Sequence, residues 1–227
     1  MKKYEFTGET MKEFGVTFRR IRALREVKQG NNVIAIKGET GGWIAEEKNL
    51  AQAGNAWVYG DARVYGNAWV YGDAQVYGDA RVSGNARVYG NAWVYGDARV
   101  YGDAWVYGDA RVYGNARVYG DAQVYGDARV SGNARVYGDA RVYDNALIIK
   151  PTDILTVGPI GSRDATTTFF RDKSGGISVV CGCFLGTLAE FAEKVTATHG
   201  DSKHAKAYRA AVELVKIQMD VKEVDAK

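Results

Sequence analysis

Residues 54–65 read GNAWVYGDARVY, two six-residue units with Gly, Ala, Val and Tyr at matching places. The same frame continues without an insertion to residue 149, which makes sixteen hexads. Gly recurs at every sixth position from Gly54 to Gly138, and the Val position runs from Val58 until Ile148 takes it. A period of six excludes an α-helix, because apolar positions on a helix recur every 3.6 residues and each interior Gly costs about 1 kcal/mol.

Each hexad predicts one short strand followed by one corner. Side chains of a strand alternate between its two sides, so Val points one way and its two neighbours point the other way. Gly-Asp and Gly-Asn are turn dipeptides, because these residues tolerate a positive φ. Three corners of about 120° close a triangular coil every eighteen residues, and stacked coils form parallel sheets about 4.8 Å apart with Val and Ala inside. Sixteen hexads therefore predict about five coils.

This pattern resembles the left-handed parallel β-helix of hexapeptide-repeat proteins, a triangular β-solenoid. In that family an aliphatic residue is followed four positions later by a small one, as Val58 is followed by Ala62. The resemblance covers residues 54–149 and implies an all-β solenoid with a left-handed winding. The hexads separate an N-terminal part, residues 1–53, from a C-terminal part, residues 150–227.

The N-terminal part predicts a β cap and a lead-in coil, since the open end of a solenoid must be covered. Residues 16–24 and 33–36 have the composition of strands. Residues 36–41 resemble a hexad displaced by two residues, and residues 41–44 with Leu50 then lead into the regular coils.

The C-terminal part predicts a small α+β domain. Strands are expected at residues 154–157, 166–170 and 177–180, with a hairpin turn at residues 173–176. Thr187 and Glu190 form a capping box that opens a helix reaching Thr198. Asp201 is expected to cap a second helix that extends through Lys222.

Segments outside the hexads resemble a family of proteins encoded in bacteriophages and prophages. They are KYEFTGE at residues 3–9, IRAL at 21–24, GGWI at 41–44, GPIGSR at 158–163 and CGCF at 181–184. This resemblance transfers no catalytic residue. It implies a protein that sequesters a host component. The most specific version of this expectation is the capture of a nucleotide signal used in bacterial immunity.

Overall composition gives few signs of a nucleic-acid or membrane partner. Thirty Lys and Arg residues against 27 Asp and Glu residues leave a net charge of +3, too little to favour either. The start of the chain has no apolar signal segment, and no apolar run approaches the length of a membrane helix. Two cysteines do not build a secreted disulfide framework. We expect a soluble, cytoplasmic protein that binds neither nucleic acid nor membrane.

The outward positions of the hexads carry the candidate binding surface. Residues eighteen apart fall on the same face, which stacks five arginines in what we call the arginine ladder: Arg63, Arg81, Arg99, Arg117 and Arg135. The column beside it reads Tyr65, Ser83, Tyr101, Tyr119 and Tyr137. A second face stacks Trp69, Arg87, Trp105, Gln123 and Arg141, and the third stacks Trp57, Gln75, Trp93, Arg111 and Arg129. Planar groups of these kinds stack on rings and bind phosphate or carboxylate.

Three interpretations of these columns stay open. The arginines can simply be solvated and offset the Asp corners. The faces can pack subunits together, in a trimer as is common among hexapeptide-repeat proteins. The ladder, with Tyr101 and Tyr119, can also hold an anionic aromatic ligand at a subunit junction. We expect assembly into a homo-oligomer, with a trimer favoured.

Two further groups of residues lie in the C-terminal part. Ser162 and Arg163, within residues 158–164, can bind an anion with the help of backbone N–H groups, although a structural turn explains the same sequence. Cys181, Cys183, His199 and His204 are potential zinc ligands, but a one-residue gap between the thiols is shorter than usual. We expect no metal and no cofactor.

Enzymatic acyl transfer is disfavoured. Many hexapeptide-repeat proteins are acyltransferases that use a His in or beside the coils as general base, and here both histidines lie after the coils. The sequence therefore predicts a non-catalytic scaffold that binds a host partner or a small anionic ligand. The alternatives are a structural spacer or virion-associated rod, and an enzyme that depends on His199, Asp164 or Arg163.

Overall fold

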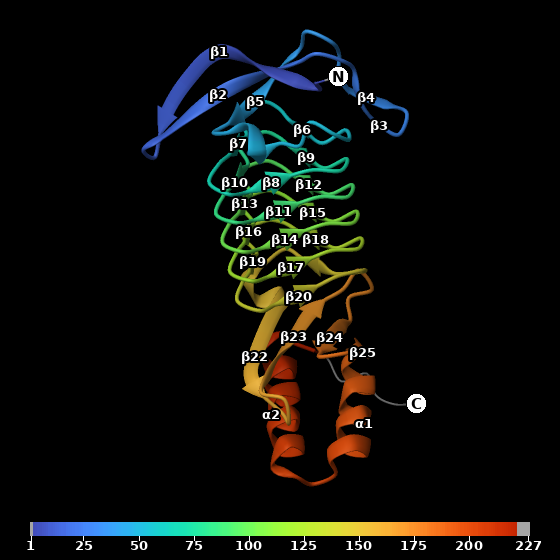
Figure 1. The fold of residues 1–227 in the computed structure, drawn as a ribbon. Coiled ribbons are helices and arrows are strands. Elements are labelled where there is room, and N and C mark those ends of the chain that lie inside the picture. The colour runs from blue at the N-terminus through green and yellow to red at the C-terminus, as the bar shows by residue number, and fades with distance from the viewer. Residues whose placement is uncertain (1, 222–227) are drawn as a thin grey trace.

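The computed structural model describes residues 2–221 and shows a β-solenoid covered at both ends (Figure 1). Each hexad contributes one two-residue strand, followed by a corner. The strands are β6 (Trp57–Val58), β7 (Arg63–Val64), β8 (Trp69–Val70), β9 (Gln75–Val76), β10 (Arg81–Val82), β11 (Arg87–Val88), β12 (Trp93–Val94), β13 (Arg99–Val100), β14 (Trp105–Val106), β15 (Arg111–Val112), β16 (Arg117–Val118), β17 (Gln123–Val124), β18 (Arg129–Val130), β19 (Arg135–Val136), β20 (Arg141–Val142) and β21 (Leu147–Ile148).

Three sheets whose solenoid strands pair in parallel form the three faces of the solenoid. The arginine face contains β7, β10, β13, β16 and β19, and the tryptophan–arginine face contains β8, β11, β14, β17 and β20. The third face contains β6, β9, β12, β15, β18 and β21. Arg81 pairs with Arg99 and Val82 with Val100, which confirms eighteen residues per coil. The handedness of the winding stays a prediction from the resemblance.

The Val and Ala columns form a continuous interior. Every Val and Ala of the hexads has an exposed fraction of 0%, as predicted. The corner glycines have positive φ values, for example 74° at Gly102, which side chains with a Cβ rarely adopt. Each corner also lies directly on the next: a Cβ built on Gly102 would come within 2.9 Å of the Gly120 nitrogen.

The first coil is out of step with the others by two residues. Ile44, in β5 (Thr40–Ile44), pairs with Val64, and Leu50 bridges Val70, each twenty residues away. This adds a sixth coil to the five predicted. The displaced hexad predicted at residues 36–41 is wrong, because Ile36 is 59% exposed. The displaced units begin instead around Ile44 and Leu50, and two additional residues lie in the corner that follows Leu50.

The N-terminal cap is made of antiparallel strands. β1 (Tyr4–Glu13) pairs with β2 (Val16–Ala23), β2 pairs with β5, and β3 (Val27–Gln29) pairs with β4 (Asn32–Ala35). β2 and β4 were predicted, whereas β1 was not, because most of its side chains are at least partly exposed and give no apolar alternation. A short 3-10 helix, η1 (Glu47–Asn49), follows β5.

This cap changes the predicted outer surface of the third face. Trp57 and Gln75 were expected to point into solvent, but they are 1% and 2% exposed. The ring of Tyr4 contacts Trp57 edge-on at 6.4 Å, and the Gln75 amide donates a hydrogen bond to Gln29. On this face, the outward residues are therefore accessible only in the coils that follow Trp57 and Gln75.

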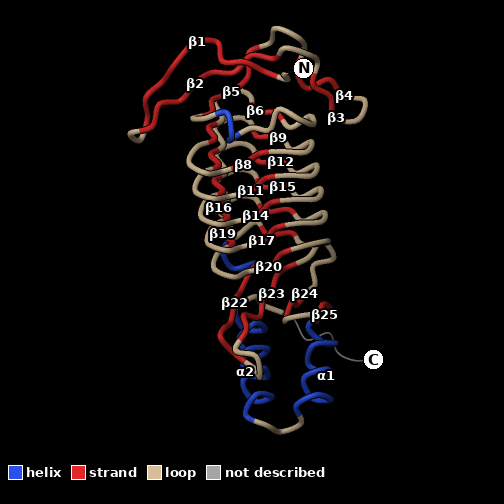
Figure 2. The backbone as a smooth tube through the Cα atoms, in the orientation of Figure 1, coloured by secondary structure: helices blue, strands red, loops and turns tan. Residues whose placement is uncertain are grey.

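The C-terminal part is an antiparallel sheet with two helices (Figure 2). After the 3-10 helix η2 (Pro151–Asp153), its strands are β22 (Ile154–Ile160), β23 (Ala165–Arg171), β24 (Ile177–Cys181) and β25 (Phe184–Thr187), and its helices are α1 (Leu188–His199) and α2 (Lys203–Gln218). The capping box of Thr187 and Glu190 is confirmed. β25 was not predicted. Ser202 rather than Asp201 caps α2, which ends at Gln218, and Lys222 lies outside the described residues.

The C-terminal sheet also closes the solenoid. Phe170 and Val180 belong to the same buried cluster as the Val and Ala columns, and Tyr143 contacts the Phe170 ring at 6.2 Å. The Lys173 amide donates to the Asn145 carbonyl at 2.8 Å. The boundary predicted at residue 150 thus separates two architectures that share one core. Within residues 2–221, no helix is long and apolar enough to cross a membrane.

We expect Gly102→Ala to destabilise the protein by at least about 1 kcal/mol more than Gly138→Ala does. Both glycines have positive φ, 74° and 61°, but a Cβ on Gly138 meets nothing within 4 Å. The two variants share the backbone strain and differ in the clash with the next coil. Urea unfolding measures the difference, and equal losses of stability would contradict tight stacking of the corners.

We also expect a pH dependence from Lys3. Burial, together with the nearby Arg25, lowers the pKa of Lys3 from 10.5 to about 7, and its Nζ donates to the Ala56 carbonyl at 2.6 Å. Between these two pH values the unfolded chain holds a proton that the folded chain has released. Stability should therefore rise with pH in this window, by up to about 1.4 kcal/mol per unit.

The variant Lys3→Met removes this amine and supplies the comparison. Urea unfolding at pH 7.5 and pH 9.5 should show a gain in the wild-type protein that is larger than the gain in Lys3→Met. Tyrosines whose pKa is raised by burial, Tyr77 to about 12 for example, act in the opposite sense above pH 10 and lie outside this window. A parallel response of the two proteins would count against a neutral buried Lys3.

Candidate functional site

The arginine ladder exists as predicted. Arg63, Arg81, Arg99, Arg117 and Arg135 are paired in sequence along one parallel sheet, each with the next. Their backbones are fixed by hydrogen bonds between coils, such as that from the Arg99 amide to the Ala116 carbonyl at 2.9 Å. The backbones of adjacent ladder arginines are therefore held one coil apart, about 4.8 Å.

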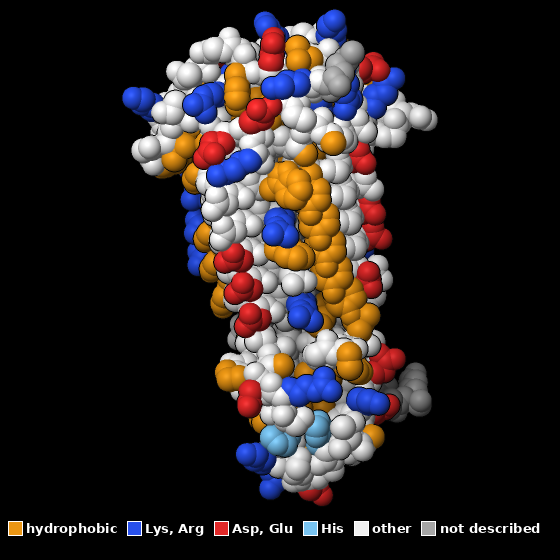
Figure 3. Space-filling view, in the orientation of Figure 1, with side chains coloured by type: hydrophobic (Ala, Val, Ile, Leu, Met, Phe, Trp, Pro, Cys, Tyr) orange, Lys and Arg blue, Asp and Glu red, His pale blue; other side chains and the backbone are white. Residues whose placement is uncertain are grey.

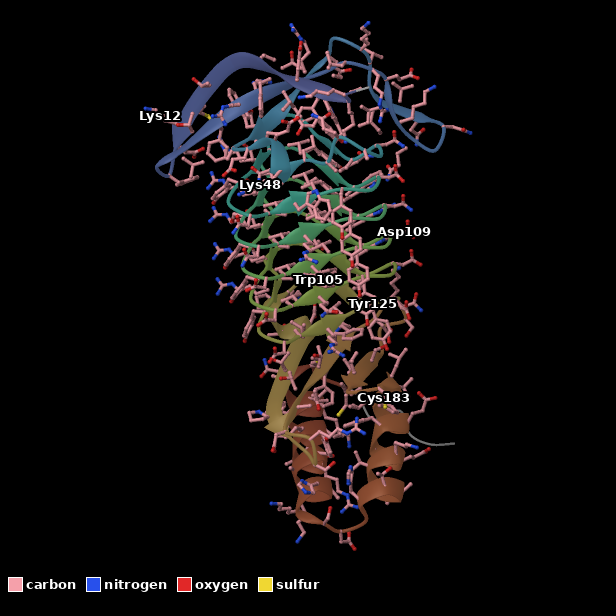
Figure 4. The ribbon with its side chains drawn as sticks, in the orientation of Figure 1. Lys12, Lys48, Trp105, Asp109, Tyr125 and Cys183 are labelled. Atoms are coloured by element: carbon pink, nitrogen blue, oxygen red, sulfur yellow. The ribbon has the colours of Figure 1, made fainter. Side chains whose placement is uncertain are left out.

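We call each arginine of the ladder a rung. The first two rungs, Arg63 and Arg81, are covered by the tip of the β1–β2 hairpin. The hairpin projects past the side of the solenoid, and Lys12 marks its outer end (Figure 4). Glu13 Oε2 lies 2.6 Å from Arg63 Nε, and Glu13 Oε1 lies 3.6 Å from Arg81 Nη2. The ring of Phe14 lies over the Arg81 guanidinium at 4.7 Å. One carboxylate thus bridges two rungs while an aromatic ring stacks on the second.

The lower three rungs have no such cover. Among residues 2–221, no carboxylate oxygen lies within 4.0 Å of Arg99, Arg117 or Arg135. Arg99 and Arg135 are exposed, and Arg117 is half-buried. Three like charges in one column raise the local positive potential and attract anions. Within residues 2–221, this part of the ladder therefore has no carboxylate neighbour of the kind that Glu13 supplies to Arg63 and Arg81.

The tyrosines beside the ladder stack on one another. The rings of Tyr101 and Tyr119 lie 4.9 Å apart and 1° from parallel, and those of Tyr119 and Tyr137 lie 5.4 Å apart. Their faces are therefore occupied, and they present ring edges and hydroxyl groups outward. The prediction that these rings offer their faces to a ligand is wrong within the stack. Ring faces are free only where a stack is interrupted.

Two hollows lie on the arginine face. The first has a volume of about 290 Å³ and is lined by Phe14, Tyr65, Arg81, Ser83, Arg99, Tyr101 and Arg117. The second has a volume of about 450 Å³ and is lined by Tyr119, Arg135, Tyr137, Pro151, Ile154, Leu155 and Thr156. The ladder residues other than Arg63 line one hollow or the other, as do Tyr101 and Tyr119. The ends of the ladder are thus bounded by the hairpin tip and by β22.

On the tryptophan–arginine face and the third face, side chains pack on one another. The Arg87 guanidinium lies over the Trp105 ring at 5.0 Å, and on the third face Arg111 lies over Trp93 at 4.8 Å. Tyr107 and Tyr125 stack at 4.8 Å, and burial raises the pKa of both. Figure 3 shows the resulting apolar stripe along the solenoid, and Figure 4 shows Trp105 and Tyr125 within it. Arg87 and Arg111 thus have aromatic partners, whereas no aromatic ring of the described residues lies over the guanidinium of Arg99, Arg117 or Arg135.

The C-terminal candidates come together in a separate pocket of about 200 Å³. It is lined by Ser162, Arg163, Ala165, Cys181, Gly182, Cys183, Phe184, Phe191, Lys194, Val195, Thr198, His199 and Tyr208. From the sequence, Ser162 and Arg163 were placed in a potential anion site and the cysteines in a potential zinc site. Neither Lys194 nor Tyr208 was named as a candidate. Residues 158–160 belong to β22, so the predicted anion loop is reduced to the turn that follows. The lining holds Arg163 and Lys194 but no carboxylate.

The pocket does not have the arrangement of a metal site. In the part of the chain that the structure describes, no three His, Cys, Asp or Glu side chains are grouped closely enough to hold a metal ion. Cys181 Sγ instead lies 3.5 Å from the Tyr208 hydroxyl, and the His199 and His204 rings lie 6.1 Å apart. Burial raises the pKa of Tyr208, with a further contribution from Cys181. Cys181, Cys183 and His199 line the pocket, whereas His204 does not.

Comparison with protein families identifies the repeat. The YdcK β-solenoid repeat family matches residues 54–72, 74–90, 80–96, 92–108, 110–126, 122–138, 128–144 and 134–149. These matches all lie within the hexads and cover less than half of the 227 residues. No curated protein matches the chain. The similarity supports a β-solenoid repeat protein and does not extend to the two ends, where the hairpin tip and the C-terminal pocket lie.

We expect Glu13→Gln to release the hairpin tip from the ladder. The amide keeps the shape of the carboxylate but loses the charge that holds Arg63 and Arg81, so the amides around Phe14 should exchange with deuterium about tenfold faster or more. Hydrogen exchange measured by mass spectrometry reads this directly. Glu9→Gln is the matched control, because Glu9 lies 4.0 Å from Arg20 on the same hairpin. Equal exchange in the two variants would contradict anchoring by Glu13.

Proposed function

We propose that this chain is a non-catalytic binding protein whose rigid solenoid presents the arginine ladder to an anionic ligand or partner. One observation carries the proposal: the chain's own carboxylate, Glu13, already contacts Arg63 and Arg81, while no carboxylate of residues 2–221 pairs with Arg99, Arg117 or Arg135. Guanidinium groups bind carboxylate and phosphate through paired N–H donors. The contacts of Glu13 with Arg63 at 2.6 Å and Arg81 at 3.6 Å support a similar placement of an external anion across two of the lower arginines.

The solenoid favours binding over catalysis. Coils joined by backbone hydrogen bonds fix the backbones of the ladder arginines one coil apart before a ligand arrives, so that binding orders only their side chains. Both histidines lie outside the solenoid, in α1 and α2, so neither is near the ladder as a general base. We therefore assign no reaction to the arginine face.

The sharpest form of the proposal is the capture of a nucleotide signal by a phage-encoded protein. Its support is the resemblance of the flanking segments and the combination of guanidinium groups with tyrosines on one face. The hollow beneath Phe14, at about 290 Å³, has the size of a small ligand.

Inorganic pyrophosphate is a suitable probe of the ladder. In isothermal titration calorimetry we expect Arg117→Gln to weaken pyrophosphate binding about tenfold, as the loss of one charge-assisted hydrogen bond does. Arg87→Gln, on the neighbouring face, should leave it unchanged, and Glu13→Gln should not weaken it. Absence of binding at millimolar pyrophosphate, or equal affinities of Arg117→Gln and Arg87→Gln, would overturn the proposal.

We propose in addition that the chain assembles as a homo-oligomer, with a trimer favoured, through the tryptophan–arginine face. The exposed ring of Trp69 and the apolar stripe on this face (Figure 3) support it, since Trp, Tyr and Arg are enriched at interfaces. Native mass spectrometry gives the subunit count. A trimer that Trp69→Glu dissociates but Arg99→Glu leaves intact would support this face, and a monomer would rule the assembly out.

A further inference from the structure

The tyrosine column beside the arginine ladder lacks one ring, at Ser83. Tyr65 precedes it by one coil and Tyr101 follows it by one coil. Neighbouring rings in the intact part of this column lie 4.9 Å apart. Tyr65 and Tyr101 are thus separated by two coils, about 9.6 Å, which leaves the space of one aromatic ring.

That space is a real hollow and it is positively charged. Its volume is about 290 Å³, and both tyrosines line it together with Ser83 and three guanidinium groups, from Arg81, Arg99 and Arg117. Among residues 2–221, no carboxylate lines it. The nearest anchored acid, Glu13, is paired with Arg63 and Arg81 above. The hollow therefore combines an unfilled place in a ring stack with two guanidinium groups, on Arg99 and Arg117, that no carboxylate of the described chain neutralises.

Phe14 forms the outer wall of the hollow. Its ring lies over Arg81 at 4.7 Å and is 58% exposed, although it is a large apolar side chain. It is held there by the turn of the β1–β2 hairpin, where Phe14 itself has a φ of 53°. An unusual backbone conformation thus presents an aromatic ring at the edge of the slot.

The second serine that replaces a tyrosine lacks these features. Ser131 lies on the third face, in the column of Tyr59, Tyr77, Tyr95 and Tyr113, and it is 5% exposed. The arginine ladder is not beside it. The combination of gap, guanidinium groups and aromatic wall is thus particular to Ser83.

We propose that the gap at Ser83 is a binding slot for a small molecule that combines an aromatic ring system with a phosphate group. The ring takes the place of the missing tyrosine between Tyr65, whose own ring meets Phe18 edge-to-face at 5.4 Å, and Tyr101, and both tyrosines line the hollow. The phosphate lies on Arg99 and Arg117. This inference rests on the proposed function and names the ligand class and the rungs that the ligand uses.

Adenosine monophosphate and ribose 5-phosphate test the slot, since they share the phosphate and the sugar and differ in the ring. Stacking of a base on aromatic side chains is strong enough to be measured directly. In isothermal titration calorimetry we expect the wild-type protein to bind adenosine monophosphate at least tenfold more tightly than ribose 5-phosphate. Equal affinities for the two probes would overturn the proposal.

The variant Ser83→Tyr places a tyrosine ring of the protein itself in the slot. The fold tolerates it, because the same position holds tyrosine in four other coils, at Tyr65, Tyr101, Tyr119 and Tyr137. We expect Ser83→Tyr to lose the preference for adenosine monophosphate, whereas Ser83→Ala, which leaves the slot open, should retain it. Tyr101→Ala removes one wall and should reduce the preference at least fivefold. A preference that survives in Ser83→Tyr would place the ring elsewhere and contradict the slot.

Failure of the slot and failure of the proposed function give different results. If pyrophosphate binds and Arg117→Gln weakens it, but the two sugar phosphates bind equally, the ladder stands and the slot is wrong. If neither pyrophosphate nor adenosine monophosphate binds, both are wrong. If the base preference is present and Ser83→Tyr abolishes it, the slot is supported.

Discussion

The closure of each coil around a column of Val and Ala side chains is the constraint on which the rest of the structure depends. Because the interior is the same in every hexad, the backbone repeats every eighteen residues and hydrogen-bonds to the next coil in register, as Tyr101 does to Val118 at 3.0 Å. An outward residue therefore becomes part of a column, and one residue type repeated every eighteen positions forms a continuous surface. Five arginines on one face follow from this geometry, and so does a single serine that leaves a gap one ring wide.

The two caps convert this regular rod into a specific surface. Both share the solenoid core, through Tyr4 at one end and Phe170 at the other. Each also reaches over the arginine face: the hairpin tip places Glu13 and Phe14 on the upper rungs, and the start of β22 bounds the hollow beside Arg135. The free rungs lie between these two ends. The two hollows of the arginine face thus lie where irregular segments meet a periodic face.

Much of this could be predicted from the sequence, because the period encodes both the interior and the register of the faces. The cap could not, since the exposed strand β1 has no apolar alternation and gives no sign that it covers Trp57 and Gln75. The mutual stacking of the tyrosines was missed, although coils about 4.8 Å apart already place like rings at stacking distance. The pocket that joins Arg163 to Lys194 depends on the packing of a turn against a helix, which local sequence does not specify.

Removal of a single hexad tests the central claim most directly. In a variant that lacks residues 102–107, the interior is unchanged, so the account predicts a folded solenoid in which Arg99 pairs with Gln123 instead of Arg117 and the C-terminal sheet is turned by one face relative to the hairpin. A crystal structure of this variant reads the pairing. A coil shortened to twelve residues that restores the Arg99–Arg117 pair, or any other winding with a different number of residues, would show that the exterior columns rather than the Val and Ala interior set the register.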